Sequence, residues 1–171
     1  MTPSQDSKQR TGEFAGLPSG RLAATAMPNL LFTELLADAD DLAELKVTLH
    51  MFWMLAHRPR KHPGMRLGEL KSDPLLQHSL SVLGGDAKET LGIALDRAVA
   101  RGALLRIAGR WKGAEEIWFF VNSAKGRDAV ERLVRGESGF EPMASETAES
   151  APSARRSIFA LYEQNVGLVQ P

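Results

Sequence analysis

The stretch from residue 86 to residue 121, DAKETLGIALDRAVARGALLRIAGRWKGAEEIWFFV, constrains the fold more than any other part of the chain. Asp86 stands where a helix N-cap is expected, and Glu89 follows three residues later, as in a reciprocal capping arrangement. Apolar residues then recur at helical spacing until Gly102, which favours a helix that ends there. The side chains expected to face the core are Leu91, Ala94, Leu95, Ala98 and Val99.

Two segments rich in branched and aromatic residues follow this helix, at 104–108 and 117–121, and both are typical of strands. The residues between them, Gly109 to Gly113, predict a turn that carries Arg110, Trp111 and Lys112. A helix, a strand, a basic turn and a second strand, in this order, are typical of a winged helix. We therefore expect a mainly α fold with a small antiparallel β-sheet, of the winged helix-turn-helix class.

The charge distribution is more informative than the formal net charge, which is zero at pH 7. Basic residues outnumber acidic ones between residues 42 and 135, whereas acidic residues dominate residues 1–41 and 136–154. A basic block of this kind suits a polyanionic partner such as DNA, although basic side chains that merely solvate a surface explain the pattern equally well. The chain has no cysteine, which excludes disulfides, thiol nucleophiles and thiolate metal sites.

The chain divides into four parts by composition. Residues 1–28 are polar and aperiodic, which predicts a disordered leader, and residues 29–135 form the expected winged-helix domain. Residues 136–155 are acidic and small, which favours a flexible linker, and residues 156–171 are amphipathic again. No segment has the length of a membrane span or the pattern of a signal peptide, so we expect a cytoplasmic protein without a membrane partner. A DNA partner for the basic block would make it nucleoid-associated.

The first long helix is expected to begin at Asp40 or Asp41 and to run to about residue 58. It is apolar on two sides, and a second apolar face must be covered by the rest of the domain or by a partner. The face assigned to the core carries Leu42, Leu45, Leu49, Phe52, Trp53 and Ala56. The opposite face, which we interpret as a self-association surface partly covered by residues 29–37, carries Val47, Met51, Met54 and Leu55.

The remaining elements are short. A strand is expected at 65–67, a helical turn at 68–71, and a helix that begins at Pro74 after the cap residues Ser72 and Asp73, with Leu75, Leu76 and Leu80 inward. A last helix at 124–135 follows the cap residues Asn122 and Ser123. Its expected inward residues are Ala129, Val130 and Leu133.

Three segments of the sequence resemble the primosomal DnaD family. DLAELKVTLHMFWML at 41–55 is similar to the first helix of DnaD-type N-terminal domains. ALDRAVARGALLRI at 94–107, with IWFFVNSAKGRDAVERL at 117–133, resembles the recognition helix, wing and closing helix. RSIFALYEQNVGLVQP at 156–171 resembles the opening of the helical DnaD domain, most of which is missing, so a truncated domain is expected there.

The resemblance implies a bacterial replication initiation or restart protein that helps to load the replicative helicase. In that family the N-terminal winged helix acts largely as an oligomerisation scaffold, and the helical domain binds DNA. The expected partners are therefore single- or double-stranded DNA, further copies of the chain, and helicase-loading or other replication initiation proteins. Two alternatives stay open: a dimeric winged-helix transcription regulator that reads duplex DNA, and an adaptor that binds only protein.

A DNA contact would involve the outer side of the central helix, where side chains can reach phosphates and base edges, together with the basic turn. Ile93, Ala100, Glu89 and Asp96 lie on or beside the same face and favour a protein partner instead. The candidate DNA-binding residues are Lys88, Thr90, Arg97, Arg101, Arg110 and Lys112.

The sequence contains no pattern of a catalytic or cofactor site. Phosphate loops, nucleophile elbows and paired carboxylates are missing, so we expect a protein that is not an enzyme and needs no cofactor. Trp111 and Trp118 could stack on bases, but a tryptophan near a wing more often covers the core. No metal site is expected from the four histidines, which lie on different elements: His50, His57, His62 and His78.

Overall fold

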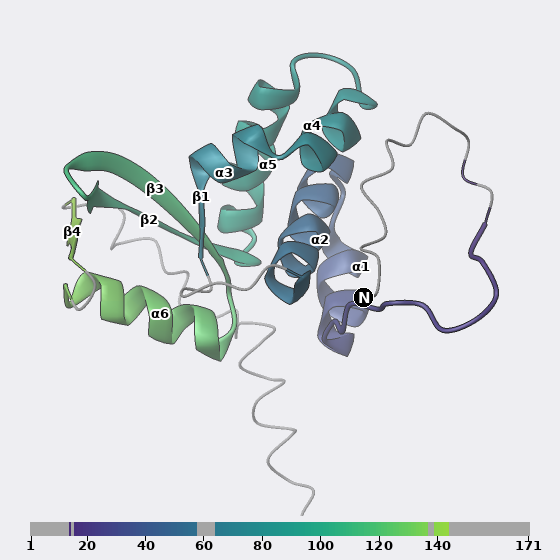
Figure 1. Ribbon diagram of the computed structural model, residues 1–171, viewed down its shortest axis with the longest axis horizontal. Helices are drawn as coiled ribbons and strands as arrows, with labels where there is room; N and C mark the ends of the chain where they lie inside the picture. The colour runs from purple at the N-terminus through teal and green to yellow at the C-terminus, as the bar shows by residue number, and fades with distance from the viewer. Residues whose placement is uncertain (1–13, 15, 58–63, 137–138, 144–171) are drawn as a thin grey trace, which may run out of the picture.

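The structure, a computed structural model, describes residues 14, 16–57, 64–136 and 139–143. These residues form a mixed α/β fold with six α-helices, a π-helical turn and a small four-stranded antiparallel sheet (Figure 1). The antiparallel sheet agrees with the sequence prediction. The segment at 156–171 that resembles the helical DnaD domain lies outside the described residues, as do residues 1–13 of the expected leader.

The elements follow the order expected from the sequence, with one strand added at the end. In chain order they are η1 (Leu31–Leu35), α1 (Leu36–Asp38), α2 (Leu42–His57), β1 (Met65–Arg66), α3 (Leu67–Ser72), α4 (Pro74–Ser81), α5 (Ala87–Ala100), β2 (Leu104–Trp111), β3 (Ala114–Val121), α6 (Ala124–Val134) and β4 (Phe140–Pro142).

Of the predicted cap residues, Asp73 and Ser123 are confirmed, whereas Ser72 lies within α3 and Asn122 donates to the Gly102 carbonyl oxygen. Asp73 accepts a hydrogen bond from the Leu76 N–H at 2.9 Å, which starts α4 with Pro74 in the first helical position. Ser123 accepts one from the Gly126 N–H at 3.1 Å and starts α6 in the same way. These local signals explain why the helix starts were predictable from the sequence.

The sheet has the strand order β1-β3-β2-β4, and a hairpin forms its centre. Strands β2 and β3 pair from Leu104 opposite Val121 to Trp111 opposite Ala114, so only two residues make the turn. Lys112 and Gly113 have φ angles of 51° and 82°, the positive values that a two-residue hairpin turn requires. The predicted five-residue turn at 109–113 is therefore too long.

The sheet is covered on both faces, α6 lying on one and α2, α3 and α5 on the other (Figure 1). Phe119 and Val121 belong to the core formed with those three helices, whereas Trp118 and Phe120 pack with Leu133 of α6. Because side chains alternate along a strand, an unbroken apolar run such as 117–121 indicates a strand buried on both faces. The inward residues predicted for α6 are confirmed.

The self-association surface predicted on the second face of α2 is wrong. The predicted self-association residues Val47, Met51 and Met54 are fully buried in the main core, and Leu55 packs against it. Of the predicted core face, Phe52 and Trp53 pack against the same core, whereas Leu42 is more than half exposed. A helix that is apolar all round carries no moment to indicate which side is buried, and here α4, α5 and the sheet bury the Val47 side.

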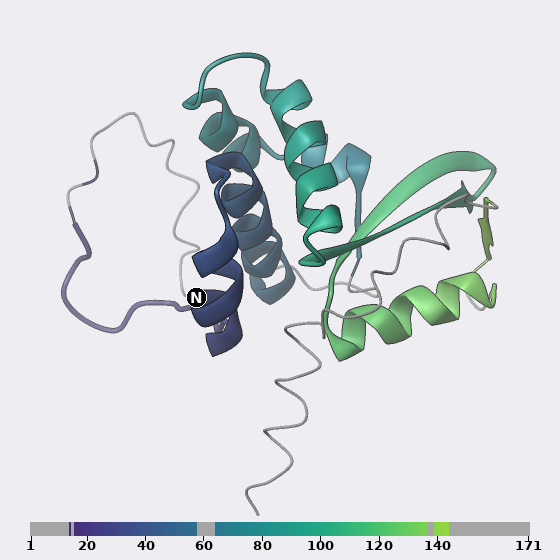
Figure 2. The same ribbon diagram turned by 180° about the vertical axis from the view of Figure 1, so that it is seen from behind.

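Two other expectations need correction, and one that left two alternatives open is resolved. Leu75 was expected to face inward, but it is exposed on α4. The sequence favours either a strand or a single helical turn for residues 29–37, and the helical alternative holds: they form η1 and α1, which lie against α2 on the side away from the sheet (Figure 2). The predicted linker begins too early, because Phe140 within it is buried and β4 pairs with β2, so the domain extends to at least residue 143.

Candidate nucleic-acid interface

Helix α5 is the element on which a DNA-reading face was expected, and its start is well defined. The Asp86 carboxylate accepts hydrogen bonds from the N–H groups of Glu89 and Lys88, at 2.9 and 2.8 Å. These two bonds, that from Glu89 first, hold the pKa of the exposed Asp86 carboxyl below its usual value. The Thr90 hydroxyl donates to the Asp86 carbonyl at 2.9 Å, so this predicted DNA contact is used within the helix.

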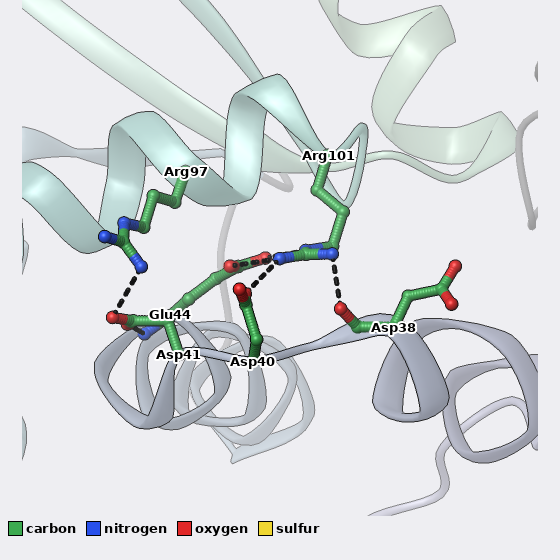
Figure 3. Close-up of polar contacts among 6 residues, drawn as sticks. All are labelled: Asp38, Asp40, Asp41, Glu44, Arg97 and Arg101. Atoms are coloured by element: carbon green, nitrogen blue, oxygen red, sulfur yellow. Dashed lines mark hydrogen bonds and ion pairs between the residues drawn. The ribbon is translucent and has the colours of Figure 1, made fainter.

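Arg101, at the end of α5, is bound to acidic groups of the chain itself (Figure 3). Its Nε donates to Glu44 at 2.7 Å, and its terminal nitrogens donate to Asp40 at 2.9 Å and to the Asp38 carbonyl oxygen at 2.6 Å. The hydrogen bond to Glu44, a residue that is only 1% exposed, is the main reason why the pKa of Arg101 is raised above its usual value. Arg101 therefore compensates a buried carboxylate.

Arg97, one turn earlier on α5, is also paired. Its guanidinium donates to Asp41 at 2.8 Å, while the other oxygen of that carboxylate caps α2 by accepting the Glu44 N–H at 2.7 Å (Figure 3). The Arg97 side chain is 51% exposed, so this pair is open to solvent and to screening by salt. Both arginines of α5 thus point toward the start of α2.

The outward surface of α5 between these pairs carries few positive charges. Ile93 is 52% exposed there, and Glu89 and Ala100 are exposed on the same side. Asp96 is exposed as well and pairs with Arg106 of β2 at 2.7 Å. An exposed isoleucine flanked by carboxylates is poorly suited to a phosphate backbone and better suited to a protein surface.

The basic turn also differs from the prediction. Lys112 occupies the hairpin turn and is exposed, as expected. Arg110 lies within β2 instead of in the turn, and its neighbours across the ladder are Glu115 of β3 and Glu141 of β4. Two carboxylates in register with Arg110 lower the positive potential of this part of the hairpin. Lys88, in the first turn of α5, is exposed.

The two tryptophans belong to the hydrophobic core. Trp118 is buried and packs with Phe120, Leu133 and Phe140, and its ring meets that of Trp111 edge to face with centroids 5.9 Å apart. A buried indole cannot stack on a base, so for Trp118 the covering role is correct.

The histidines do not come together. His50 lies 3.1 Å from Asp73 and His57 Nδ1 lies 3.0 Å from the Trp53 carbonyl oxygen, while His78 is on α4 and His62 lies outside the described residues. Across the described ranges, no three His, Asp or Glu side chains are grouped so that they could hold a metal ion. In the same ranges, no helix has the length and apolar character needed to cross a membrane.

The residues that sequence reasoning missed are the acidic partners of the arginines. The sequence predicts Asp40 or Asp41 as the N-cap of α2, and it indicates no arginine partner for these residues, for Asp38 or for Glu44. The signal was present in the charge distribution, since the run of acidic residues at 38–44 precedes a basic block in the same domain. From sequence, a polyanionic partner and a solvated surface explain that block equally well; in the structure, part of its charge is paired within the chain.

No protein-family model, no curated protein and no solved structure matches the chain.

Proposed function

We propose that the chain is a DnaD-like accessory protein of bacterial DNA replication initiation or restart. In this proposal its folded domain is a self-associating winged-helix scaffold that aids helicase loading and contacts DNA only secondarily. The proposal rests on the resemblance of three sequence segments and on the order of the elements from α2 to α6. It agrees with the small antiparallel sheet, and in this proposal the β2–β3 hairpin is the wing.

The observation that carries the scaffold role is the pairing of both arginines on α5. A helix that reads duplex DNA in the major groove presents side chains that donate to guanine edges and phosphates. Arg101 is committed to the buried Glu44, and Arg97 is bonded to Asp41. The outward side of α5 instead carries Ile93 among acidic residues, which suits a protein partner.

A secondary DNA contact is supported by Lys88 and Lys112, the two lysines among the candidate residues, which are both exposed. They lie on different elements, the first turn of α5 and the hairpin turn, and lysine contacts a phosphate as a point charge without reading sequence. We therefore propose weak binding that does not distinguish DNA sequences.

The transcription-regulator alternative is less well supported by this geometry. It requires Arg97 and Arg101 to reach base edges, and each would first have to leave its carboxylate partner. Leaving Glu44 buried without its cation is expected to cost several kcal/mol, roughly 3–5 by comparison with other buried pairs. We keep this alternative as the competing outcome of the test below.

The test combines DNA binding with the state of association. Fluorescence anisotropy with labelled single- and double-stranded oligonucleotides at several salt concentrations should give weak binding with a log–log salt slope of about −2, as for roughly two neutralised phosphates. Light scattering after gel filtration should show oligomers that grow with protein concentration. A slope steeper than about −4 together with strong duplex preference would favour the regulator. A monomer at all concentrations would exclude the scaffold.

A further inference from the structure

Residues 31–38, which comprise η1 and α1, form a small separate unit that we call the strap. Leu31 and Leu35 are its buried side chains, at 1% and 3% exposure. They pack with Leu49 and Phe52 of α2 and with Ala103, three residues that we call the strap site. The buried members of this cluster are not part of the main core, but Phe52 contacts both. Two buried leucines must offset the entropy of ordering the strap, so its docking depends on a small amount of apolar burial.

Arg101 is the side chain that fastens the strap to the rest of the domain. One terminal nitrogen donates to the carbonyl oxygen of Asp38, the last residue of α1, at 2.6 Å. The same guanidinium binds Asp40, in the connection to α2, and Glu44, within α2 (Figure 3). The end of the strap, its connection and the next helix are therefore joined through one cation, two of whose three contacts lie at the surface.

The connection allows the strap to move as a unit. It comprises residues 39–41, between α1 and α2, and Ala39 has extended backbone angles. On the other side of the strap, residues 16–28 contain no helix or strand. Displacing the strap therefore requires a change at a short hinge and moves no other regular element within the described residues.

We propose that two copies of the chain exchange their straps, so that the strap of each copy occupies the strap site of the other. This inference rests on the proposed function, which requires self-association, and it names the surface that does so. The occupant fits because it is the same segment already bound there, so Leu31 and Leu35 make identical contacts in both arrangements. Exchange of an identical element is a low-cost route to a dimer, and a short hinge favours it.

The principal experiment is complementation between two full-length variants. Leu31→Glu/Leu35→Glu has a strap that cannot dock, and Leu49→Glu has a strap site that cannot receive one. Gel filtration with light scattering should show a concentration-dependent dimer for the unmodified chain and a monomer for each variant alone. An equimolar mixture should form a heterodimer, because the intact strap of the second variant can dock on the intact site of the first. A mixture that stays monomeric overturns the proposal.

Hinge length provides a second test that leaves every contact of the strap intact. Inserting Gly-Ser-Gly-Ser between Ala39 and Asp40 relaxes the connection, and it should raise the dimer dissociation constant about tenfold by favouring the closed monomer. The same insertion between Gly84 and Gly85, which lie between α4 and α5, is the matched control and should change nothing. Equal effects of the two insertions overturn strap exchange. If circular dichroism shows that a glutamate variant is unfolded, the two insertion variants alone test strap exchange.

The outcomes separate this inference from the proposed function. If the unmodified chain dimerises and Leu31→Glu/Leu35→Glu dimerises equally well, strap exchange is wrong and the scaffold role stands. If the unmodified chain is monomeric at every concentration, both are wrong. Heterodimer formation by the complementary variants supports both.

Discussion

Replacing Arg101 by methionine should destabilise the domain far more than replacing Arg97. Methionine keeps the length of the aliphatic stem but leaves Glu44, which is 1% exposed, without its cation. Removing one partner of a buried ion pair costs about 3–5 kcal/mol. Because the Arg101 side chain is itself 26% exposed and water can reach the site, we expect the lower end of that range. A loss of about 3 kcal/mol corresponds to a fall in Tm of about 12 °C for a domain of roughly this size.

Arg97→Met is the matched control, since it removes the same type of side chain from the same helix. Its pair with Asp41 is exposed, and pairs of this kind contribute about 0–1 kcal/mol. Thermal and urea unfolding followed by circular dichroism at neutral pH measures both losses. The double variant Glu44→Gln/Arg101→Met should recover much of the stability, because no buried charge remains. The reasoning would be refuted if the two arginine variants lost equal stability, or if the double variant were no better than Arg101→Met.

Three further predictions concern the core, the cap of α5 and the last strand. Met51→Glu should unfold the domain and not merely separate oligomers, because it places a charge in a fully buried position. Urea unfolding should show that the free energy of unfolding falls by at least about 3 kcal/mol. A folded monomer would contradict the burial of Met51. Because the pKa of Asp86 is lowered in the folded state, its carboxylate contributes fully to stability at pH values above 3.8, its usual pKa, and this contribution is lost as the pH falls through the lower pKa of the folded state. Asp86→Asn should therefore flatten the pH dependence of the unfolding free energy below about pH 4. An unchanged pH dependence in this acidic range would contradict the prediction. Gly109→Ala should loosen β4 and lower the free energy of unfolding by about 1–3 kcal/mol, because the added Cβ would lie 2.3 Å from the Phe140 ring. Faster amide exchange at residues 140–142 would report the loosening. Unchanged exchange would show that β4 tolerates the methyl group.

Local signals in the sequence were sufficient for much of the fold. Asp73 and Ser123 marked helix starts because a capping residue acts on the next turn of its own helix. The run at 117–121 marked a strand, and the sequence also indicated the hairpin and the closing helix. The predicted turn was too long because Lys112 adopts a positive φ angle, which the sequence does not indicate when the residue is not glycine.

The incorrect predictions concern which surfaces meet, because pairing depends on distant parts of the chain. Nothing local distinguishes Met51 from Phe52 as a core residue when both sides of α2 are apolar. Similarly, Arg101 has the position of a DNA contact in sequence, and its partner Glu44 lies 57 residues earlier. Phe140 looked like part of a linker because its strand is three residues long and is stabilised by β2 and α6. Long-range complementarity of charge and shape was the missing information.

The central claim is that the arginines of α5 serve the fold and not the recognition of DNA. The most direct test is the affinity for a labelled duplex, measured by anisotropy across a salt series, of the unmodified chain, Arg97→Ala and Lys112→Ala. Arg97→Ala should change neither the affinity by more than about twofold nor the salt slope, whereas Lys112→Ala should flatten the slope by about 0.9, the loss of one phosphate contact. A loss of affinity of about tenfold or more in Arg97→Ala, with a slope reduced by about 0.9, would contradict the claim and place DNA on α5.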